Sequence, residues 1–105
     1  ADFGVTAEDI YTPTYKVILK GVTEGRNGLG SIYVFGSGNG GKFDDCNYDG
    51  YASSPYTVTV SSINADDNNF DFIEPCSAIL ASTYSGAGKW PIYTPDVGES
   101  RCSTK

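Results

Sequence analysis

The sequence predicts an α/β fold with a mostly parallel sheet, one clear helix and long loops. Three features predict it: helical spacing of apolar residues near the N-terminus, a continuous apolar run between glycines, and two later β-branched or apolar runs. The chain has 105 residues, so it is at most one small domain. A single helix leaves at least one face of such a sheet uncovered, so we expect these residues to be part of a larger α/β domain.

Residues 7–27 have the spacing of an amphipathic helix, and Asn27-Gly28 is typical of a helix end. Proline is tolerated only in the first turn of a helix, so Pro13 places the helical part at about 11–26. The apolar residues that recur at helical spacing are Ile10, Tyr11, Tyr15, Ile18, Leu19 and Val22.

Four segments are predicted as strands. Residues 31–35 form a continuous apolar run, which predicts a strand buried on both faces, as in a parallel sheet. Residues 56–63 alternate and are rich in β-branched side chains, residues 78–84 form a third strand, and residues 92–94 form a short one. The Gly-, Asn- and Asp-rich residues 36–55 are predicted as a long loop, and loops of that length are usually functional.

Charge and composition exclude several functions. Thirteen acidic and seven basic residues give a net charge of −6, which disfavours nucleic acid and anionic membranes and suits basic peptides or Ca²⁺. An acidic surface can also serve solubility alone. The chain has no histidine, so these residues alone cannot form a Ser–His or Cys–His pair or a His-ligated metal site. No apolar run is long enough for a transmembrane segment.

Three cysteines, Cys46, Cys76 and Cys102, are present in an odd number and without a C-x-x-C spacing, which argues against a zinc or thioredoxin-type site. One explanation is a disulfide plus a third cysteine whose partner lies outside this chain, which implies a secreted or lumenal protein. The other explanation is three buried free thiols.

Two motif matches in the long loop are incomplete. Residues 36–41 fit the dinucleotide fingerprint G-x-G-x-x-G, but no helical pattern follows and two carboxylates come next, which disfavours nucleotide binding. Residues 45–50 fit the first half of an EF-hand loop, but Tyr56 occupies the position of the bidentate Glu. Calcium ligation in another geometry and a solvated acidic loop both remain open; the available carboxylates are Asp2, Asp44, Asp45 and Asp49.

Asn39 lies in this glycine-rich loop, just past the end of a predicted parallel strand, where α/β sheets place their sites. Its side-chain amide can donate a hydrogen bond to a developing oxyanion. The alternative is that Asn39-Gly40 is only a turn.

The run GLGSIYVFGSGNGG at 28–41, followed by CNYDGY at 46–51, resembles the kexin/furin group of subtilisin-like proprotein convertases. The resemblance covers nearly the whole chain and continues through EPCSA at 74–78 and TYSG at 83–86. It implies that the chain is an internal fragment of the subtilisin-like catalytic domain of a calcium-dependent serine endopeptidase. Such an enzyme cleaves basic peptides or proproteins after paired basic residues.

The resemblance also implies roles for single residues. Asn39 matches the oxyanion-hole Asn, and Asp49 matches a carboxylate at the base of the pocket for the substrate's Arg. Glu8 and Asp2 match residues of the basic-substrate pockets. The implied calcium ligands are Asp2, Asp44 and Glu74.

The cysteine pattern is explained by the same resemblance. Cys46 and Cys76 match a family disulfide, and Cys102 matches a cysteine whose partner lies upstream of this chain. The implied location is the secretory pathway, in the Golgi lumen, or the extracellular space, for a parent protein that can carry a membrane anchor. We expect no nucleic-acid partner.

The resemblance places the catalytic Asp and His before residue 1 and the nucleophilic Ser after Lys105, so these residues alone should be inactive. Gly36 stands where the family usually has Ala, and the loop between Asn39 and Cys46 is one residue short. These departures make an inactive pseudoprotease fragment one alternative function. The Asp-rich loop and the absence of histidine make a small secreted acidic calcium-binding module the other.

Overall fold

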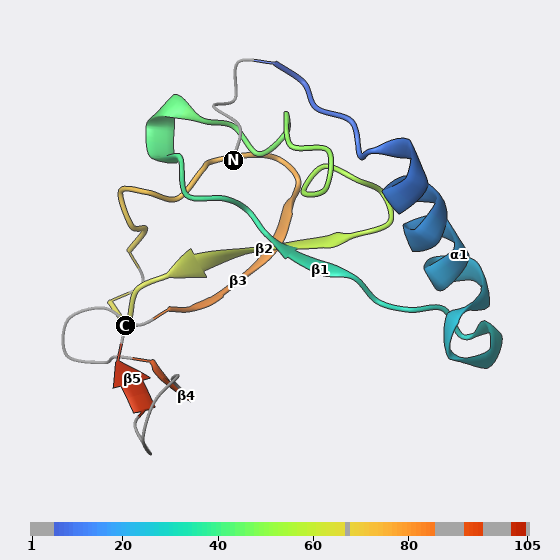
Figure 1. The fold of residues 1–105 in the computed structure, drawn as a ribbon. Helices are drawn as coiled ribbons and strands as arrows, with labels where there is room; N and C mark the ends of the chain where they lie inside the picture. Colours follow the sequence, from blue (N-terminus) through green and yellow to red (C-terminus); the bar gives the residue numbers. More distant parts are fainter. Residues whose placement is uncertain (1–5, 67, 86–91, 96–101, 105) are drawn as a thin grey trace.

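The computed structural model describes residues 6–66, 68–85, 92–95 and 102–104. Strands β1, β2 and β3 form a parallel sheet in that order, while β4 and β5 form an antiparallel pair (Figure 1). One helix with a mainly parallel sheet confirms the predicted α/β class. The elements are α1 (Thr12–Gly28), β1 (Val34–Gly36), the 3-10 helix η1 (Gly41–Phe43), β2 (Val58–Ile63), β3 (Ile79–Tyr84), β4 (Tyr93–Pro95) and β5 (Cys102–Thr104).

Helix α1 begins one residue before Pro13, as predicted, because proline needs no backbone N–H partner in the first turn. Its regular geometry ends earlier than its bounds suggest: Gly25 has ψ of 156°, and Arg26 and Asn27 have φ of 54° and 58°. The N–H of Gly30 closes this end by donating to the carbonyl of Gly25 at 2.9 Å. Among the described residues, no helix has the length and apolar character needed to cross a membrane.

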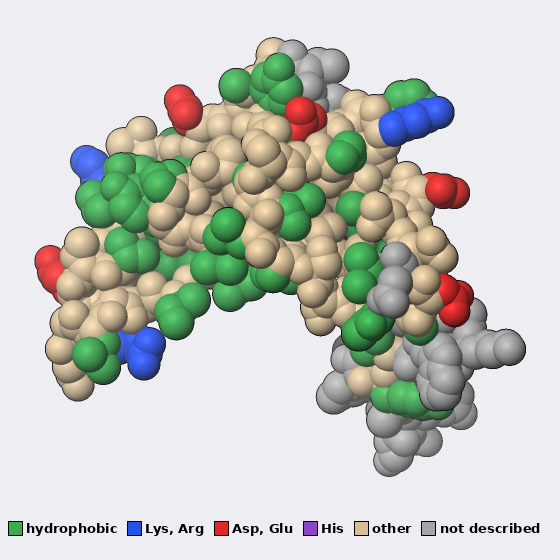
Figure 2. Space-filling view, turned by 180° about the vertical axis from the view of Figure 1, so that it is seen from behind, with side chains coloured by type: hydrophobic (Ala, Val, Ile, Leu, Met, Phe, Trp, Pro, Cys, Tyr) green, Lys and Arg blue, Asp and Glu red, His purple; other side chains and the backbone are tan. Residues whose placement is uncertain are grey.

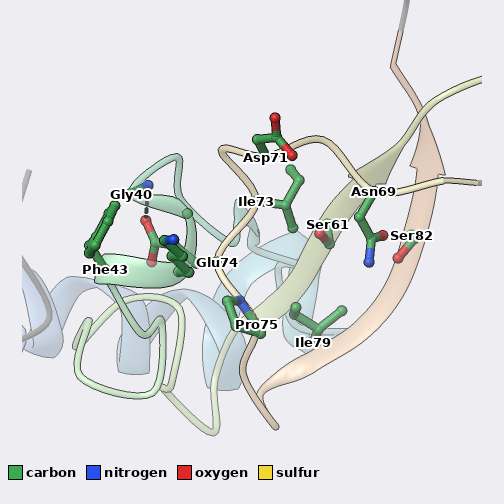
Figure 3. A pocket seen from close by; sticks show the side chains of 12 residues that line it. Gly40, Phe43, Ser61, Asn69, Asp71, Ile73, Glu74, Pro75, Ile79 and Ser82 are labelled. Carbon is green, nitrogen blue, oxygen red and sulfur yellow. Dashed lines mark hydrogen bonds between the residues drawn. The ribbon is translucent and has the colours of Figure 1, made fainter.

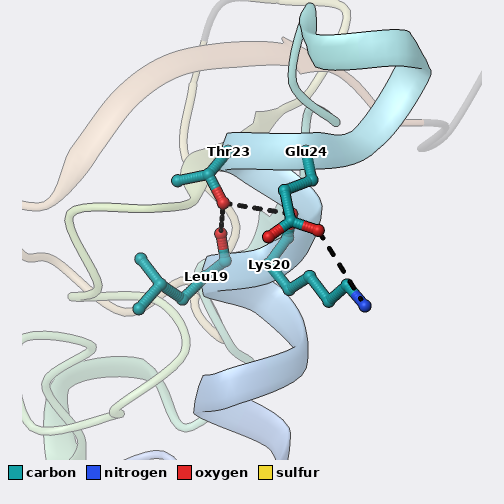
Figure 4. Close-up of polar contacts among 4 residues, drawn as sticks. All are labelled: Leu19, Lys20, Thr23 and Glu24. Atoms are coloured by element: carbon teal, nitrogen blue, oxygen red, sulfur yellow. Dashed lines mark hydrogen bonds and ion pairs between the residues drawn. The ribbon is translucent and has the colours of Figure 1, made fainter.

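On the solvent side of α1, the polar contacts to other described residues are local (Figure 4). The Thr23 hydroxyl donates to the Leu19 carbonyl at 2.8 Å, and Lys20 and Glu24 form an exposed ion pair at 3.9 Å. Exposed pairs at this spacing contribute about 0.3–0.5 kcal/mol, so tertiary packing, not this face, holds the helix in place.

The inner side of α1 packs through Ile18, which is buried, and through Gly21, where a Cβ would overlap the hydroxyl of Tyr33. Tyr15 meets Tyr56 edge-on, with ring centroids 5.7 Å apart. A side-chain hydrogen bond with Tyr56, followed by charge interaction with it, raises the pKa of Tyr15. The helix is thus joined to the residues that lead into β1 and β2.

The prediction that the first strand is buried on both faces is wrong. Ile32 and Val34 are 71% and 61% exposed, whereas Phe35, on the other face, stacks on Tyr51 with centroids 5.2 Å apart. No described element covers the Ile32 and Val34 face, which agrees with the expectation that one sheet face is left open. Figure 2 shows hydrophobic side chains gathered on the hollowed side of the molecule.

The long connection between β1 and β2 contains only the short helix η1 among its described elements, yet it is firmly packed. Cys46 is fully buried and forms a disulfide with Cys76, which confirms the paired explanation for these two cysteines. The buried Thr59 hydroxyl donates to the carbonyl of Ala52. These contacts replace the helix that usually links two parallel strands.

Candidate functional site

Asn39 is presented by a tight turn at the carboxyl end of the parallel sheet. Ser37 is buried and its N–H donates to the carbonyl of Val60 at 3.1 Å, which extends the β1–β2 pairing by one residue. Gly38 follows with φ of 102°, a conformation that favours glycine, and the next residue, Asn39, is exposed. The turn therefore directs the chain out of the sheet directly before the amide side chain.

A pocket of about 460 Å³ lies beside Asn39. Residues 36–39 line one part of it, residues 60–62 of β2 line another, and Thr83 and Tyr84 at the end of β3 contribute as well. Neighbouring parallel strands end together here, which is the usual location of ligand sites in α/β sheets.

Asp49 is held in a fixed orientation by the backbone that follows it. Its Oδ1 accepts the N–H groups of Tyr51 at 2.6 Å and Ala52 at 2.9 Å. The stacking of Tyr51 on Phe35 joins this turn to β1. Oδ2 accepts no hydrogen bond from the part of the chain that the structure describes, so this oxygen is available to a cationic ligand.

The segment containing Glu8 lies against the Asp49 turn. The N–H of Glu8 donates to the carbonyl of Tyr48 at 2.7 Å. A Cβ on Gly50 would lie 2.5 Å from the Glu8 carbonyl oxygen and 2.7 Å from the nitrogen of Ile10, so glycine is required for this approach. The structure thus brings Glu8 and Asp49, both predicted to bind substrate, onto adjacent stretches of backbone.

Glu74 and Asp44 converge on the loop that carries Asn39. Glu74 is 5% exposed, and its Oε1 accepts the N–H of Gly40 at 2.7 Å (Figure 3). A Cβ on Gly40 would lie 2.5 Å from Oδ2 of Asp44, and one on Gly38 would overlap the Glu74 carboxylate. Two carboxylates therefore approach the same turn.

The disulfide follows each of these carboxylates by two residues, with Cys46 and Cys76 Cα atoms 5.5 Å apart. Hard oxygen donors on two linked loops suit Ca²⁺. The described residues hold no group of three or more acidic or cysteine side chains able to ligate a metal. Asp2, the third predicted ligand, lies outside the described residues, and only the backbone of Cys102, the first residue of β5, is described.

Sequence reasoning missed a second pocket of about 800 Å³ between η1 and the sheet (Figure 3). Phe43, Asp71, Ile73 and the buried Glu74 are among its lining residues. It also missed that Gly38 and Gly40 are required by the carboxylates beside them. The close spacing of four glycines in residues 36–41 is the sequence signal that could have indicated the latter.

Comparison with known proteins identifies the relatives of this chain. It is 45% identical over 106 residues to neuroendocrine convertase 2 of Drosophila melanogaster, covering 98% of this chain and 16% of that protein. It is 50% identical over 90 residues to kexin of Saccharomyces cerevisiae, covering 84% of this chain and 11% of that protein. Human neuroendocrine convertase 2 is 46% identical over 88 residues, covering 84% and 14%. No model of a protein family matches the chain.

The chain therefore belongs to the kexin-type proprotein convertases. It spans between 11% and 16% of the length of these three relatives.

Proposed function

We propose that this chain forms part of the catalytic domain of a calcium-dependent serine endopeptidase that cleaves proproteins after paired basic residues. It supplies the oxyanion-hole amide and the acidic pocket for the substrate's Arg. The observation that carries this function is the position of Asn39, an exposed amide on a pocket at the carboxyl edge of a parallel sheet. The disulfide between Cys46 and Cys76 supports an oxidising location, in the secretory pathway or outside the cell.

In the proposed reaction, serine attacks the scissile carbonyl with histidine as base. The chain contains no histidine, so the base comes from another part of the protease. The family resemblance implies that the catalytic Asp and Ser also lie outside these residues. Asn39 donates its side-chain N–H to the oxygen that becomes negatively charged. The Ser37–Val60 and Gly40–Glu74 hydrogen bonds hold the turn on both sides of Asn39, so the donor needs little reorganisation during the reaction.

Asp49 binds the arginine side chain that precedes the cleaved bond. Its Oδ1 is committed to two backbone N–H groups, so Oδ2 receives the guanidinium. Glu8, on the neighbouring segment, faces further basic residues of the substrate, and Asp2 is proposed to do the same.

Replacing Asp49 by Asn should reduce kcat/KM for an arginyl peptide by about 30-fold or more, because the guanidinium loses its anionic partner. The amide keeps an oxygen for the N–H groups of Tyr51 and Ala52, so the fold should persist. The measurement is kcat/KM of the full-length protease on peptides that differ only in Arg or Leu before the cleaved bond. Asp45→Asn is the matched control, because among the described residues the Asp45 side chain accepts only the exposed N–H of Asn47. An equal loss in both variants, or on both peptides, would contradict the assignment.

The carboxylates of Asp44, Glu74 and Asp2 are proposed to hold the calcium ion. The first two fit this role: they are oxygen donors on loops joined by a disulfide, and one of them is buried. A bound Ca²⁺ would supply positive charge that compensates the carboxylates. With its carboxylate fixed in this way, Glu74 would hold the turn next to Asn39 in place through its hydrogen bond with the N–H of Gly40.

When calcium is first removed from the full-length protein with a chelator, adding it back at 100 times its Kd should raise the free energy of unfolding by about 2.7 kcal/mol. Glu74→Gln should abolish most of this increase. The measurement is Tm with and without Ca²⁺. Glu24→Gln is the control, because Glu24 is an exposed residue of α1. A calcium-dependent Tm increase that is unchanged in Glu74→Gln would remove this residue from the site.

The convergence of Asp44 and Glu74 also favours a second candidate, a small calcium-binding module without catalysis. This module must fold by itself. A cooperative thermal transition of the isolated 105 residues that Ca²⁺ sharpens, together with no peptidase activity in the full-length protein, would favour the module. An open apolar sheet face predicts that the isolated chain will not show such a transition.

A further inference from the structure

The chain contains two Asn-Gly pairs, Asn27-Gly28 and Asn39-Gly40, and both asparagines are exposed. Asparagine loses its side-chain amide most readily when glycine follows it, because glycine has no side chain to hinder the approach of its nitrogen to the asparagine Cγ. At position 39 this reaction would convert the amide at the carboxyl edge of the sheet into a carboxylate. The chemistry of this one dipeptide therefore bears on the whole candidate site.

Packing requires glycine after Asn39. Gly40 has an ordinary φ of −80°, but a Cβ built on it would overlap the Cβ of Asp44 and lie 2.8 Å from its Cγ. A side chain at position 40 would thus displace Asp44 from the turn. The simplest way to slow the loss of the amide, which is a bulkier residue after Asn39, is excluded by this contact.

The reaction needs the backbone nitrogen of Gly40, and the N–H of that nitrogen is engaged. It donates to Oε1 of Glu74 at 2.7 Å (Figure 3). Glu74 is 5% exposed and hydrogen bonds to a carboxylate are stronger than neutral ones, so water does not readily replace this acceptor. The next peptide is held as well, because the N–H of Gly41 donates to the carbonyl of Phe72 at 2.8 Å. Before the nitrogen can attack the Asn39 side chain, it must give up its hydrogen bond to Glu74.

We propose that Asn39 is a deamidation site and that Glu74 is a positioning residue that suppresses this reaction in the folded protein. In the reaction, the Gly40 nitrogen bonds to Cγ of Asn39 and the Cγ–Nδ2 bond breaks. The proton of the Gly40 nitrogen passes through solvent to Nδ2, which leaves as ammonia. Water then opens the resulting cyclic imide at either of its carbonyl carbons, which gives aspartate or isoaspartate at position 39.

This inference goes beyond the proposed protease function and does not depend on it, because the reaction needs only Asn39, Gly40 and water. Its test needs no peptidase activity. If Asn39 is the oxyanion donor, deamidation removes the N–H that binds the oxygen and puts a negative charge in its place. Glu74 then preserves the residue on which the proposed catalysis depends.

The test measures deamidation at Asn39 and Asn27 in the same full-length protein, by mass spectrometry of the peptides that contain them. The rate at each asparagine in the denatured protein is divided by its rate in the native protein, which gives a protection factor for each site. A calcium chelator is present throughout, so that bound metal does not differ between variants. In the wild type, Asn39 should be protected about tenfold or more.

Two substitutions separate the hydrogen bond from the space that the side chain fills. Glu74→Leu has no acceptor oxygen and should remove most of the protection at Asn39. Glu74→Gln keeps an acceptor for the N–H of Gly40 and should retain part of the protection, whereas a side chain that only filled space would affect both variants alike. Asn27 should keep its wild-type protection factor in both. Should Glu74→Leu fail to show a thermal unfolding transition, Glu74→Gln decides, because it must lower the protection at Asn39 and not at Asn27.

Asp44→Asn is the matched control, because Asp44 lies against the same glycine while its Oδ1 accepts the N–H of Asp45 at 2.8 Å. It should leave the protection at Asn39 unchanged. The inference is overturned if wild-type Asn39 deamidates as fast in the native as in the denatured protein, or if folded Glu74→Leu keeps the wild-type protection. Slower deamidation in Glu74→Leu would also overturn it, since Glu74 would then promote the reaction as a base.

Discussion

Replacing Asn39 by Ala in the full-length protease should lower kcat by about 10²–10³ with little change in KM. The amide is expected to bind the oxygen only when it carries negative charge, so its loss affects the transition state and not substrate binding. Asn39 is exposed and no hydrogen bond from its side chain to the described residues is found, so the truncation should leave Tm unchanged. Steady-state kinetics on an arginyl peptide gives both constants.

Asn69→Ala is the control for this experiment, because Asn69 is an exposed Asn that lines the other pocket. It should keep the wild-type kcat. A wild-type kcat in Asn39→Ala would exclude Asn39 from the mechanism. A large rise in KM at constant kcat would instead assign it to substrate binding.

Removing the disulfide with Cys46→Ala and Cys76→Ala together should cost about 2–5 kcal/mol of the free energy of unfolding. The disulfide links cysteines that are 30 residues apart in the sequence and so closes a long loop, and Cys46 is fully buried. The same change should weaken calcium binding, because Asp44 and Glu74 lie two residues before the linked cysteines. Denaturant unfolding measures the first effect, and calcium titration of the full-length protein measures the second.

The next residues in the two loops provide a matched control. Ser77 donates its hydroxyl to Oδ1 of Asn47 at 2.9 Å, so this pair also joins the loops, but by an exposed hydrogen bond. Ser77→Ala should cost no more than about 1 kcal/mol. Equal losses from the control and the double cysteine variant would show that the covalent link has no special role.

Local patterns predicted the elements whose signals are contained within short stretches of sequence. The start of α1 follows from Pro13, and the positions of β2 and β3 follow from their own side chains. The exposure of Ile32 and Val34 could not be predicted, because burial of a strand depends on what covers it. Strand β5 was missed because its three residues are defined only by pairing with β4.

The candidate site also has a part that local sequence predicted and a part that depends on contacts between distant residues. Asn39 could be located because glycines and a preceding strand mark its turn within a few residues. The contact between Glu74 and Gly40 joins residues 34 apart, so only the family resemblance suggested that these loops belong together. The functional roles of all the predicted site residues stay predictions: Asn39, Asp49, Glu8, Asp44, Glu74, Asp2 and Cys102.

The Glu74–Gly40 hydrogen bond has a consequence for the order in which the protein matures. Asn39 is synthesised 35 residues before Glu74. The hydrogen bonds on both sides of its turn, Ser37–Val60 and Gly40–Glu74, therefore cannot both form until residue 74 has been synthesised. Contacts of such long sequence separation form late in folding, because chain closure must precede them. The amide proposed as the oxyanion donor is therefore expected to reach its final orientation only after residue 74 has been synthesised and paired with Gly40. The Cys46–Cys76 disulfide lies two residues beyond Glu74, so its closure restrains the same segment and we expect it to stabilise this pairing.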